Sequence, residues 1–345
     1  MKRRSSRPTI TDVAHDAGVA IMTVSRVVNG GSYVSPATEK RVRASIRRLG
    51  YTPNEAARML KGQRARIIGL VVPDLGDAFF ATCANAVQEV AGRHGYMTLI
   101  VTSEHSEETE SNELEMMAAR RVAGLLIVPS HLSADKRLRK LQAAEIPVVA
   151  LDRTLDGMDA GEVIVENAGG AEEAVRHLIG HGHQRIACVG YDAKAFTVHQ
   201  RIQGYRRAMR DAGLKPETWI NVATAAAMEA LLRRLMAEKD RPTALFTLNN
   251  VSSVHALQAI RALQLRMASD IAMIGFDDLE LAPLLEVPLT AVRQPAVEMG
   301  RSAARMLFDM IQRTRTVSTG AAPERRVVLA TQLIIRSSCG CNAGQ

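Results

Sequence analysis

Short apolar runs alternate with longer helical stretches from Ile67 onward, and this alternation limits the possible folds more than any other feature of the chain. Strands are predicted at Ile67 to Val72, Tyr96 to Val101, Gly124 to Val128, Pro147 to Leu151, Glu162 to Val165, Arg185 to Val189, Thr243 to Leu248 and Ile271 to Phe276. Helices are predicted near Ala168 to His181, Arg201 to Ala212, Ala225 to Lys239 and Ser252 to Ala262. This alternation is typical of parallel sheets with crossover helices.

The strands fall into two series, the second of which begins with Glu162 to Val165. We therefore expect an α/β core with two lobes, each built on a doubly wound parallel sheet. Open parallel sheets bind ligands beyond the carboxyl ends of their strands. The crevice between the two lobes is the expected ligand pocket.

Charge divides the chain near residue 66. Residues 1 to 66 contain fourteen Lys and Arg against four Asp and Glu, a net of +10, whereas the whole chain contains 44 against 36, a net of +8. The remainder is therefore nearly neutral, at −2. A basic run is usually only a solvated surface, but an excess confined to one end favours binding of a polyanion such as DNA.

The segment from residue 9 to residue 29 has the pattern of two short helices joined by a turn. Thr9 and Asp12 match an acidic variant of the capping box, and Gly18 is placed to end the first helix in a left-handed turn. In the second helix, valines recur at three- and four-residue spacing and form an inner face. The residues left facing outward are Thr23, Ser25 and Arg26.

Such a pair is a helix-turn-helix, whose second helix lies in the major groove with its N-terminal residues at the base edges. Ile21, Met22 and Arg26 then occupy base-reading positions. A short helix pair also occurs as a plain structural corner, so the motif needs support from the rest of the chain.

A third helix is predicted from Ser35-Pro36, a cap followed by proline in the first turn, to about Leu49 before Gly50. Its Lys and Arg side chains would meet the DNA backbone or water. Residues 54 to 62 are good helix formers in a stretch too short to be stable alone, so this segment can order on binding. A plain linker is the alternative.

The words DVA, AGV, TVSRVVN and YTPN resemble the N-terminus of the lactose-repressor (LacI/GalR) family of bacterial transcription regulators. The resemblance implies that residues 54 to 62 form a hinge helix, two copies of which pair in the minor groove and insert a leucine from each between base pairs. Leu60 matches that leucine. The expected DNA-binding residues are Thr9, Ile21, Met22, Thr23, Ser25, Arg26, Asn29, Ala57, Arg58 and Leu60.

The remainder resembles the periplasmic sugar-binding-protein fold that this family carries as its core. Positions that match the family's effector-binding residues are Phe79, Phe80, Asp152, Arg153, Arg201, Asn249, Asp277 and Gln294. Carboxylates such as Asp152 and Asp277 accept hydrogen bonds from sugar hydroxyls, a guanidinium can donate several, and an aromatic ring can cover an apolar sugar face. All are expected at strand ends or loop starts.

Ordinary structural roles compete with these assignments. One of Phe79 and Phe80 is expected to belong to the core. Asp278 is expected to cap the following helix. Arg201 alone could form a surface salt bridge, although the joint match of several positions favours the pocket.

The sequence departs from the family pattern in three places, the last of which is that Ile21 and Met22 are apolar where some relatives carry hydrogen-bonding residues. Asn250 stands where the family commonly has aspartate, so one carboxylate acceptor is missing, which could suit an anionic effector. Ala20 stands where a serine usually caps the recognition helix, which removes one phosphate contact. Because Ile21 and Met22 are apolar, the half-site would be read partly through thymine methyl groups, and the operator sequence should differ from those of relatives.

No metal site, cofactor or disulfide framework is expected. His177, His181 and His183 look like a metal cluster by composition, but we assign them to capping and helix-dipole roles. Cys339 and Cys341 could contact a metal, but they have no further ligands near them in the sequence, so we assign them to a loose tail with no function. No apolar run approaches a membrane span, and the basic start is followed by a polar helix rather than a signal peptide's apolar region. The protein is therefore expected in the cytoplasm with reduced thiols.

Other classes of protein explain less of the chain. P-loop, GxGxxG, GxSxG and HExxH motifs are absent, so we expect no enzyme. A solute-binding protein with an incidental basic N-terminus would explain the core, but it would need export and would not use residues 1 to 66. A nucleoid-type DNA binder would explain the charge but not the pocket.

The sequence thus predicts an N-terminal all-α helix-turn-helix DNA-binding domain and a two-lobed, periplasmic-binding-protein-like α/β core of doubly wound parallel sheets. The expected boundaries are 1–52 for the headpiece, 53–66 for the hinge and linker, and 67–345 for the core, with an N-lobe of about 67–161 plus 293–323 and a C-lobe of about 162–292 plus 324–345.

The expected function is that of a transcriptional regulator, usually a repressor in this family, which binds double-stranded operator DNA and a sugar, sugar acid or related metabolite as effector. The family's tetramers use a C-terminal leucine-heptad helix. The chain ends in SSCGCNAGQ, without heptads, so we expect a homodimer.

Overall fold

The computed structural model describes residues 8–29, 34–51, 66–130, 136–191, 195–315 and 325–341. The chain divides into two compact units, residues 1–65 and 66–345. Nearly all of the predicted hinge, residues 53–66, lies outside the described residues, so the hinge helix stays a prediction.

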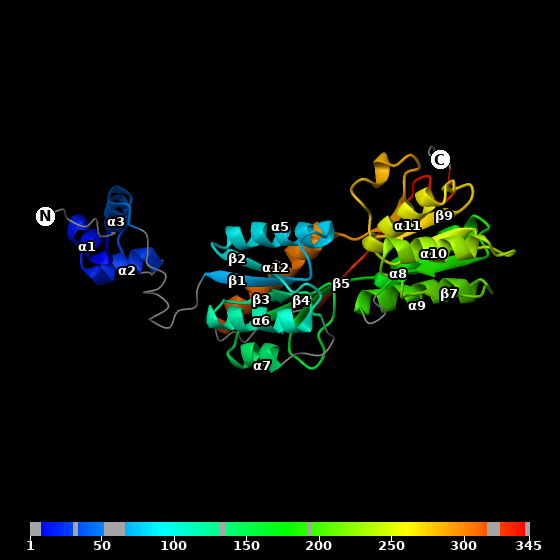
Figure 1. Cartoon of the computed structure of the whole chain (residues 1–345). Helices are drawn as coiled ribbons and strands as arrows, with labels where there is room; N and C mark the ends of the chain where they lie inside the picture. The colour runs from blue at the N-terminus through cyan, green and yellow to red at the C-terminus, as the bar shows by residue number, and fades with distance from the viewer. Residues whose placement is uncertain are drawn as a thin grey trace. The chain divides into compact units, whose positions relative to one another are not determined.

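The first unit contains three helices within its described part, α1 (Ile10–Ala17), α2 (Ile21–Asn29) and α3 (Pro36–Leu49) (Figure 1). The predicted capping box is confirmed, because Thr9 Oγ1 accepts a hydrogen bond from the Asp12 amide and the Asp12 carboxylate accepts one from the Thr9 amide at 2.7 Å. Gly18 adopts φ +62° and ends α1, which lets α2 start at Ile21 in a new direction.

One small core joins these three helices. Val13, Val24 and Val42, one from each helix, are fully buried at its centre. The valine spacing that predicted the inner face of α2 is therefore confirmed. This packing fixes the angle between α1 and α2, and the unit is a helix-turn-helix domain.

The first lobe of the second unit is a parallel sheet of six strands in the order β11-β5-β4-β3-β1-β2. Helices α5 and α12 pack on one face of the sheet, and α6 and α7 pack on the other (Figure 1). Its elements are β1 (Ile67–Val72), α5 (Ala78–Arg93), β2 (Met97–Thr102), α6 (Glu107–Ala119), β3 (Leu125–Ile127), α7 (Lys136–Ala143), β4 (Val148–Leu151), β5 (Gly161–Val165), α12 (Ala296–Arg315) and β11 (Arg326–Leu329).

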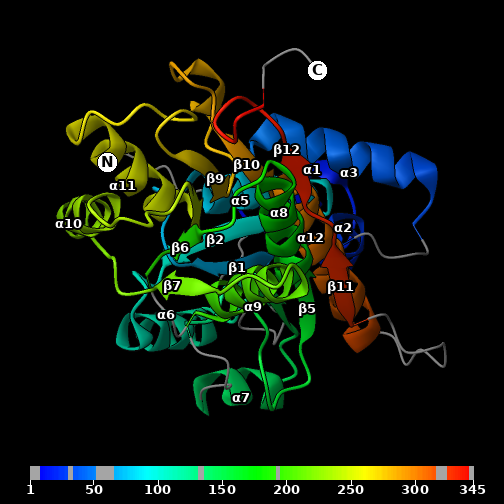
Figure 2. The ribbon, with the colours of Figure 1, turned by 90° about the vertical axis from the view of Figure 1, so that its right-hand side faces the viewer.

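The second lobe is a six-stranded sheet in the order β12-β10-β9-β8-β6-β7, parallel except for β12, which pairs antiparallel with β10. Helices α8 and α9 cover one face, and α10 and α11 cover the other (Figure 2). Its elements are α8 (Asn167–Gly180), β6 (Ile186–Val189), α9 (Phe196–Asp211), β7 (Glu217–Trp219), α10 (Ala225–Met236), β8 (Ala244–Thr247), α11 (Asn250–Ala262), β9 (Ala272–Phe276), the 3-10 helix η1 (Ala282–Leu284), β10 (Thr290–Arg293) and β12 (Gln332–Ile334).

The lobe border differs from the predicted one. Strand β5 pairs with β4 and with β11 in the first sheet, so the assignment of residues 162–165 and of β11 to the second lobe is wrong. Within the described residues, the chain passes between the lobes after β5, after β10 and after β11. The apolar pattern of a buried strand does not say which sheet the strand joins, and only the pairing decides it.

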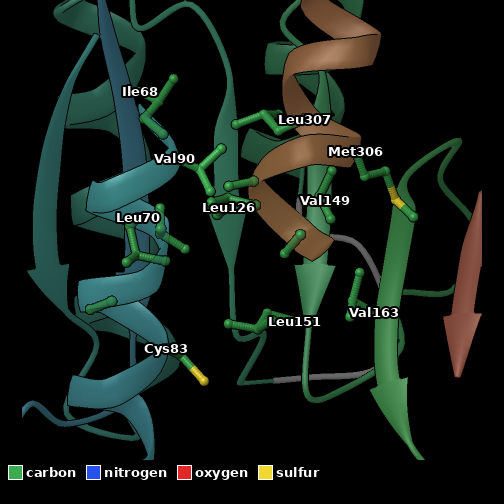
Figure 3. Packing of buried hydrophobic residues seen from close by; sticks show 14 of the residues in the cluster. Ile68, Leu70, Cys83, Val90, Leu126, Val149, Leu151, Val163, Met306 and Leu307 are labelled. Carbon is green, nitrogen blue, oxygen red and sulfur yellow. The ribbon is translucent and has the colours of Figure 1, made fainter. Parts of the chain in front are cut away.

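Apolar side chains from β1, β3, β4 and β5 meet α5 and α12 in one continuous core (Figure 3). The contact is close at the start of β5, because a Cβ added to Gly161 would lie 2.4 Å from Met306 Sδ of α12. Packing at this density holds α12 against the first sheet, and with it the preceding segment between the lobes.

All predicted strands are confirmed to within one residue at each end. Helix α9 begins at Phe196, five residues before its predicted start, because Thr197 and Val198 are buried and extend its inner face. Helix α10 ends three residues before its predicted end, at Met236. Of the helices in the described ranges, none has the length and apolarity that a bilayer span requires.

The C-terminal segment is bound to the second lobe as far as Cys341, so the prediction of a loose tail from Cys339 is wrong. Ser338 Oγ accepts a hydrogen bond from the Thr290 amide at 2.7 Å and donates one to the Met273 carbonyl at 2.6 Å. Cys339 is fully buried beside them. These contacts join residues far apart in the sequence, which the local composition of the tail does not reveal.

Candidate functional site

A cavity of about 640 Å³ lies between the two lobes. Segments that follow the strands of both sheets supply most of its lining, as expected for open parallel sheets. The eight residues predicted to bind an effector all line it. That they contact an effector stays a prediction. The further lining residues are Asp77, His105, Tyr191, Ala195, Thr197, Val198, Ile220, Asn221, Ala223 and Asn250.

Arg201 is buried at this cavity, and several groups of the protein hold its guanidinium in place. Its Nε donates to Asn167 Oδ1 at 2.8 Å, and its Nη1 donates to the Leu248 carbonyl at 2.8 Å. Nη1 also lies 3.5 Å from the Asp277 carboxylate, and the guanidinium carbon lies 3.7 Å from the centre of the Phe276 ring. Arg201 is therefore not a surface salt bridge, and its orientation is fixed before any ligand binds.

Arg201 lies inside α9, and Phe79 and Phe80 lie in the first turn of α5, so the expectation that all eight residues lie at strand ends or loop starts is wrong for these three. The helix begins beside the cavity, and its early residues Thr197 and Val198 also line it. Burial lowers the pKa of Arg201, while the nearby Asp277 and Asp152 oppose that shift.

Asp277 joins the second lobe to the segment between the lobes. It follows β9 with φ +75°, and its Oδ2 accepts a hydrogen bond from the Asn250 amide at 3.2 Å. Its other oxygen accepts a hydrogen bond from Gln294 Nε2, and Gln294 lies where the chain passes from β10 to α12. A ligand that binds Asp277 or Gln294 would therefore touch the connection between the lobes.

Asp152 is the most strongly perturbed carboxyl group of the cavity. It follows β4 with φ +66° and is only 4% exposed. Burial raises its pKa to about 6, against the opposing effect of Arg153 and Arg201. Its Oδ2 lies 3.7 Å from Arg153 Nε, a loose ion pair that compensates only part of the cost of burial.

Three buried polar atoms on the cavity have no hydrogen-bond partner within the described part of the chain. They are Asp152 Oδ1, Arg153 Nε and Gln294 Oε1. Leaving one such group unsatisfied costs about 1–3 kcal/mol. The three atoms belong to residues that line the cavity but have almost no accessible surface themselves, so a small movement of their side chains would offer two acceptors and one donor to water or a polar ligand.

The aromatic pair divides as predicted. Phe80 is 6% exposed and packs in the core of the first lobe, whereas Phe79 is only half-buried. Their rings meet edge to face with centroids 5.1 Å apart. The core ring thus supports Phe79, which is the better placed of the two to cover an apolar ligand face.

Two residues of the site escaped the sequence prediction. Asn167 opens α8 directly after β5, and its side chain orients Arg201. Asp77 caps α5 by accepting a hydrogen bond from the Phe79 amide at 2.9 Å, and burial raises its pKa. Both residues follow the carboxyl ends of strands in the first sheet, and this position in the sequence could have identified them as pocket candidates.

Two expectations about neighbouring residues change. Asp278 does not cap a helix, because its carboxylate binds Arg336 at 2.7 Å and also Arg293. These hydrogen bonds outweigh the effect of burial and lower its pKa. Asn250, which replaces a carboxylate of the family pattern, forms a side-chain hydrogen bond with Asp77 that favours the ionised carboxylate and opposes part of the rise in pKa that burial causes.

In the first unit, the N-terminal turn of α2 presents large apolar side chains to solvent. Ile21 is 48% exposed and Met22 is 65% exposed, and Arg26 on the next turn is exposed too. Exposed apolar groups beside a cation are suited to thymine methyl groups and base edges. Thr9 caps α1, while Thr23 and Ser25 are half-buried.

The remaining predicted DNA contacts cannot be placed. Three of them, Ala57, Arg58 and Leu60, lie outside the described residues, and the side chain of Asn29 is not described either. Ala20 contributes its backbone to the start of α2, since its carbonyl accepts a hydrogen bond from the Thr23 amide at 2.9 Å. The start of α2 therefore keeps this backbone hydrogen bond although Ala20 has no capping hydroxyl.

Comparison with known proteins agrees with this architecture. Residues 9–54 match the family described as bacterial regulatory proteins, lacI family, and residues 175–339 match the periplasmic binding protein-like domain. The HTH-type transcriptional repressor PurR of Aliivibrio fischeri (strain MJ11) is 35% identical over 310 residues, which cover 88% of this chain and 92% of that protein.

Solved structures agree as well. The Lac repressor dimer bound to operator and the anti-inducer ONPF superimposes with a TM-score of 0.81 at 27% identity, covering 97% of this chain and 99% of that one. A complex of the transcriptional regulator CelR with cellobiose gives a TM-score of 0.69 at 31% identity, covering 96% and 100%. The chain therefore belongs to the lacI family of bacterial regulatory proteins, the DNA-binding transcriptional repressors that small-molecule effectors control.

Proposed function

We propose that this regulator represses its target genes as a homodimer on a pseudo-palindromic operator, and that a sugar or sugar acid bound between the lobes changes its affinity for that operator. Ile21, Met22 and Arg26 would read each half-site, and Leu60 would insert between base pairs of the minor groove. The protein would act in the cytoplasm, where the chromosomal DNA lies, and it would repress by binding DNA and effector without catalysing a reaction.

The observation that carries the proposed effector class is the set of unsatisfied polar atoms on the cavity, Asp152 Oδ1, Arg153 Nε and Gln294 Oε1. A sugar hydroxyl both donates and accepts, so neighbouring hydroxyls can satisfy the two acceptors and the donor together. The cavity volume lies within the usual range of about 300–1,000 Å³ for small-molecule pockets. The cellobiose complex of CelR, a relative at 31% identity, supports the same class.

A sugar acid is favoured within this class by the two arginines of the cavity. Arg201 is fixed by Asn167 and Leu248, and Arg153 Nη1 donates to the Pro129 carbonyl at 3.1 Å. Both guanidinium groups are thus preorganised, which reduces the entropy cost of binding a carboxylate.

Effector binding would act through the lobe angle. Gln294 lies between β10 and α12 and is hydrogen-bonded to Asp277 of the second lobe. A ligand can bind the side-chain oxygen Oε1 of Gln294 more tightly in one arrangement of the lobes than in the other. Such a ligand shifts the populations of the two arrangements. That shift would decide whether the two hinge segments can pair on DNA.

The test is a thermal-shift screen of sugars, sugar acids, nucleosides and nucleobases on the wild-type protein, followed by measuring the effect of each hit on binding to a selected operator. At least one sugar or sugar acid should raise the melting temperature and change operator affinity. Gln294→Ala should lose both responses yet bind the operator without ligand, whereas Gln203→Ala, an exposed position on α9, should behave like wild type. Hits confined to nucleosides or bases would refute the effector class.

The assembly has its own test. Light scattering or sedimentation at micromolar protein should give the mass of a dimer without operator, and the mass of a dimer plus one operator duplex with it. A tetrameric mass would contradict the proposed assembly but would leave the effector class untouched.

A further inference from the structure

Four side chains that can ligate a metal meet at the C-terminal end of α8. His177 and His181 come from this helix and its cap, and Cys339 and Cys341 come from the C-terminal segment. Their candidate ligand atoms all lie within 4.8 Å of one another, and no second group of this kind occurs in the described part of the chain. The cluster contradicts our expectation that the two cysteines would find no further ligands.

The distances between these atoms are short. Cys341 Sγ lies 3.0 Å from His181 Nε2 and 3.4 Å from His177 Nε2. Cys339 Sγ lies 3.3 Å from His177 Nε2. Around a tetrahedral zinc ion, bonds of about 2.3 Å to sulfur and about 2.0 Å to nitrogen would separate the two kinds of ligand atom by about 3.5 Å. These three sulfur-to-nitrogen distances need only a small expansion to admit the ion, while ligand atoms farther apart, up to 4.8 Å, would have to move closer together.

Local structure explains why the four groups converge. The two histidines are four residues apart, so both rings project from the same face at the end of α8. Between the cysteines, Gly340 adopts φ +95°, a conformation that turns the chain sharply and that other residues rarely adopt. Ser338 anchors the segment to Met273 just before the first cysteine.

We propose that His177, His181, Cys339 and Cys341 bind one zinc ion in a tetrahedral Cys2His2 site. Two thiolates and two imidazoles are the ligand set of closed structural zinc sites, and soft sulfur ligands disfavour magnesium and calcium. All four positions are filled by protein, so the site leaves no open position for catalysis.

Groups around the cluster support this ligand set. Thr290 Oγ1 donates to Cys339 Sγ at 3.2 Å, the kind of hydrogen bond that stabilises a metal-bound thiolate. His183 does not belong to the group of converging ligand atoms, because its Nδ1 is paired with Thr243 Oγ1 at 2.9 Å and its ring also forms a hydrogen bond with the Cys339 backbone. The two histidines of α8 and its cap are therefore the candidate ligands, whereas His183 has a structural role.

The zinc would fasten the end of the chain to the second lobe. Asn167, which orients Arg201 in the effector pocket, begins the same helix, and His177 lies about 15 Å along it from that residue at the usual rise per residue. The ion therefore should stabilise the lobe without touching the effector. This separates the inference from the proposed effector class, and either can fail alone.

The test uses untagged full-length protein purified with a reductant, because an added histidine tag would bind zinc. Elemental analysis should find about one zinc per chain, and removal by a chelator should lower the melting temperature by about 5–10 °C, the shift for free zinc about a hundredfold above its dissociation constant. Replacement by Co(II) should give the intense visible bands of tetrahedral cobalt and a thiolate charge-transfer band.

Matched variants locate the ion. Cys341→Ser and His181→Ala are at partly exposed positions and should lose the cobalt bands, whereas Cys188→Ala and His199→Ala in the same lobe should keep them. The proposal is overturned if the reduced wild-type protein contains no stoichiometric zinc and binds no Co(II) through sulfur. It is also overturned if the bands persist in both site variants, or if Cys339 and Cys341 are found joined as a disulfide.

Discussion

Replacing Asp152 by asparagine should stabilise the ligand-free protein more at neutral pH than at acid pH. The native pKa of Asp152 is about 6, against 3.8 for an ordinary aspartate, because the carboxyl group is buried. Between these two values the folded state holds a proton that the unfolded state has released, so stability falls as the pH rises. At 1.36 kcal/mol per pKa unit, the total loss is on the order of 3 kcal/mol.

Asparagine is the matched substitution for this position. Asp152 has φ +66°, a conformation that asparagine tolerates at least as well as aspartate, and the two side chains have the same shape. The introduced amide cannot ionise, so the unfolding free energy of the variant does not fall with rising pH through this group. The difference in unfolding free energy between Asp152→Asn and wild type should therefore increase by about 2 kcal/mol between roughly pH 4 and pH 7, whatever its value at pH 4.

The assay is urea unfolding at a series of pH values, followed by circular dichroism and by the fluorescence of Trp219, the single tryptophan. Carboxyl groups that do not interact with Asp152 titrate equally in the two proteins and cancel in the difference, and the coupling to Asp277 and Asp77 is smaller than the effect of burial. Asp156→Asn, at an exposed position that does not line the cavity, serves as control and should give a difference that is flat with pH. A flat or shrinking difference for Asp152→Asn would refute the reasoning that burial dominates at this carboxyl group.

The remaining predictions concern packing and DNA. Gly204→Ala should lower the unfolding free energy by about 1–3 kcal/mol, because its Cβ would lie 2.0 Å from the Ala168 carbonyl oxygen where α9 crosses α8. In the same urea assay, the control Gly92→Ala should be neutral or stabilising, because its Cβ would have nothing within 4 Å. Arg26→Ala should raise the operator dissociation constant by about 5- to 150-fold in a titration with labelled DNA, the effect of losing about 1–3 kcal/mol of base contact. Equal losses on unrelated DNA would argue against base reading. Leu60→Ala should weaken operator binding far more than non-specific binding, and similar losses on both would remove the wedge role.

Much of the fold was predictable because its signals are local. The capping box of Thr9 and Asp12, the turn at Gly18 and the valine spacing of α2 all act within about twenty residues, and each is present in the structure. The strands were predictable for the same reason, since a short apolar run between turn signals marks a buried strand wherever it pairs. The resemblance to a known family then indicated which strand ends line the pocket.

Tertiary structure alone decided which distant segments meet. Strand β5 joined the first sheet and not the second, Asp278 met Arg336, 58 residues away, and Asn167 met Arg201. His177 and Cys339 are separated by 162 residues in the sequence. The two histidines and the two cysteines therefore look like unrelated pairs in the sequence, whereas the fold brings them into one cluster. Local patterns report periodicity and burial, but pairing across a sheet or between a helix and a tail depends on how the whole chain packs, and no window of sequence contains that information.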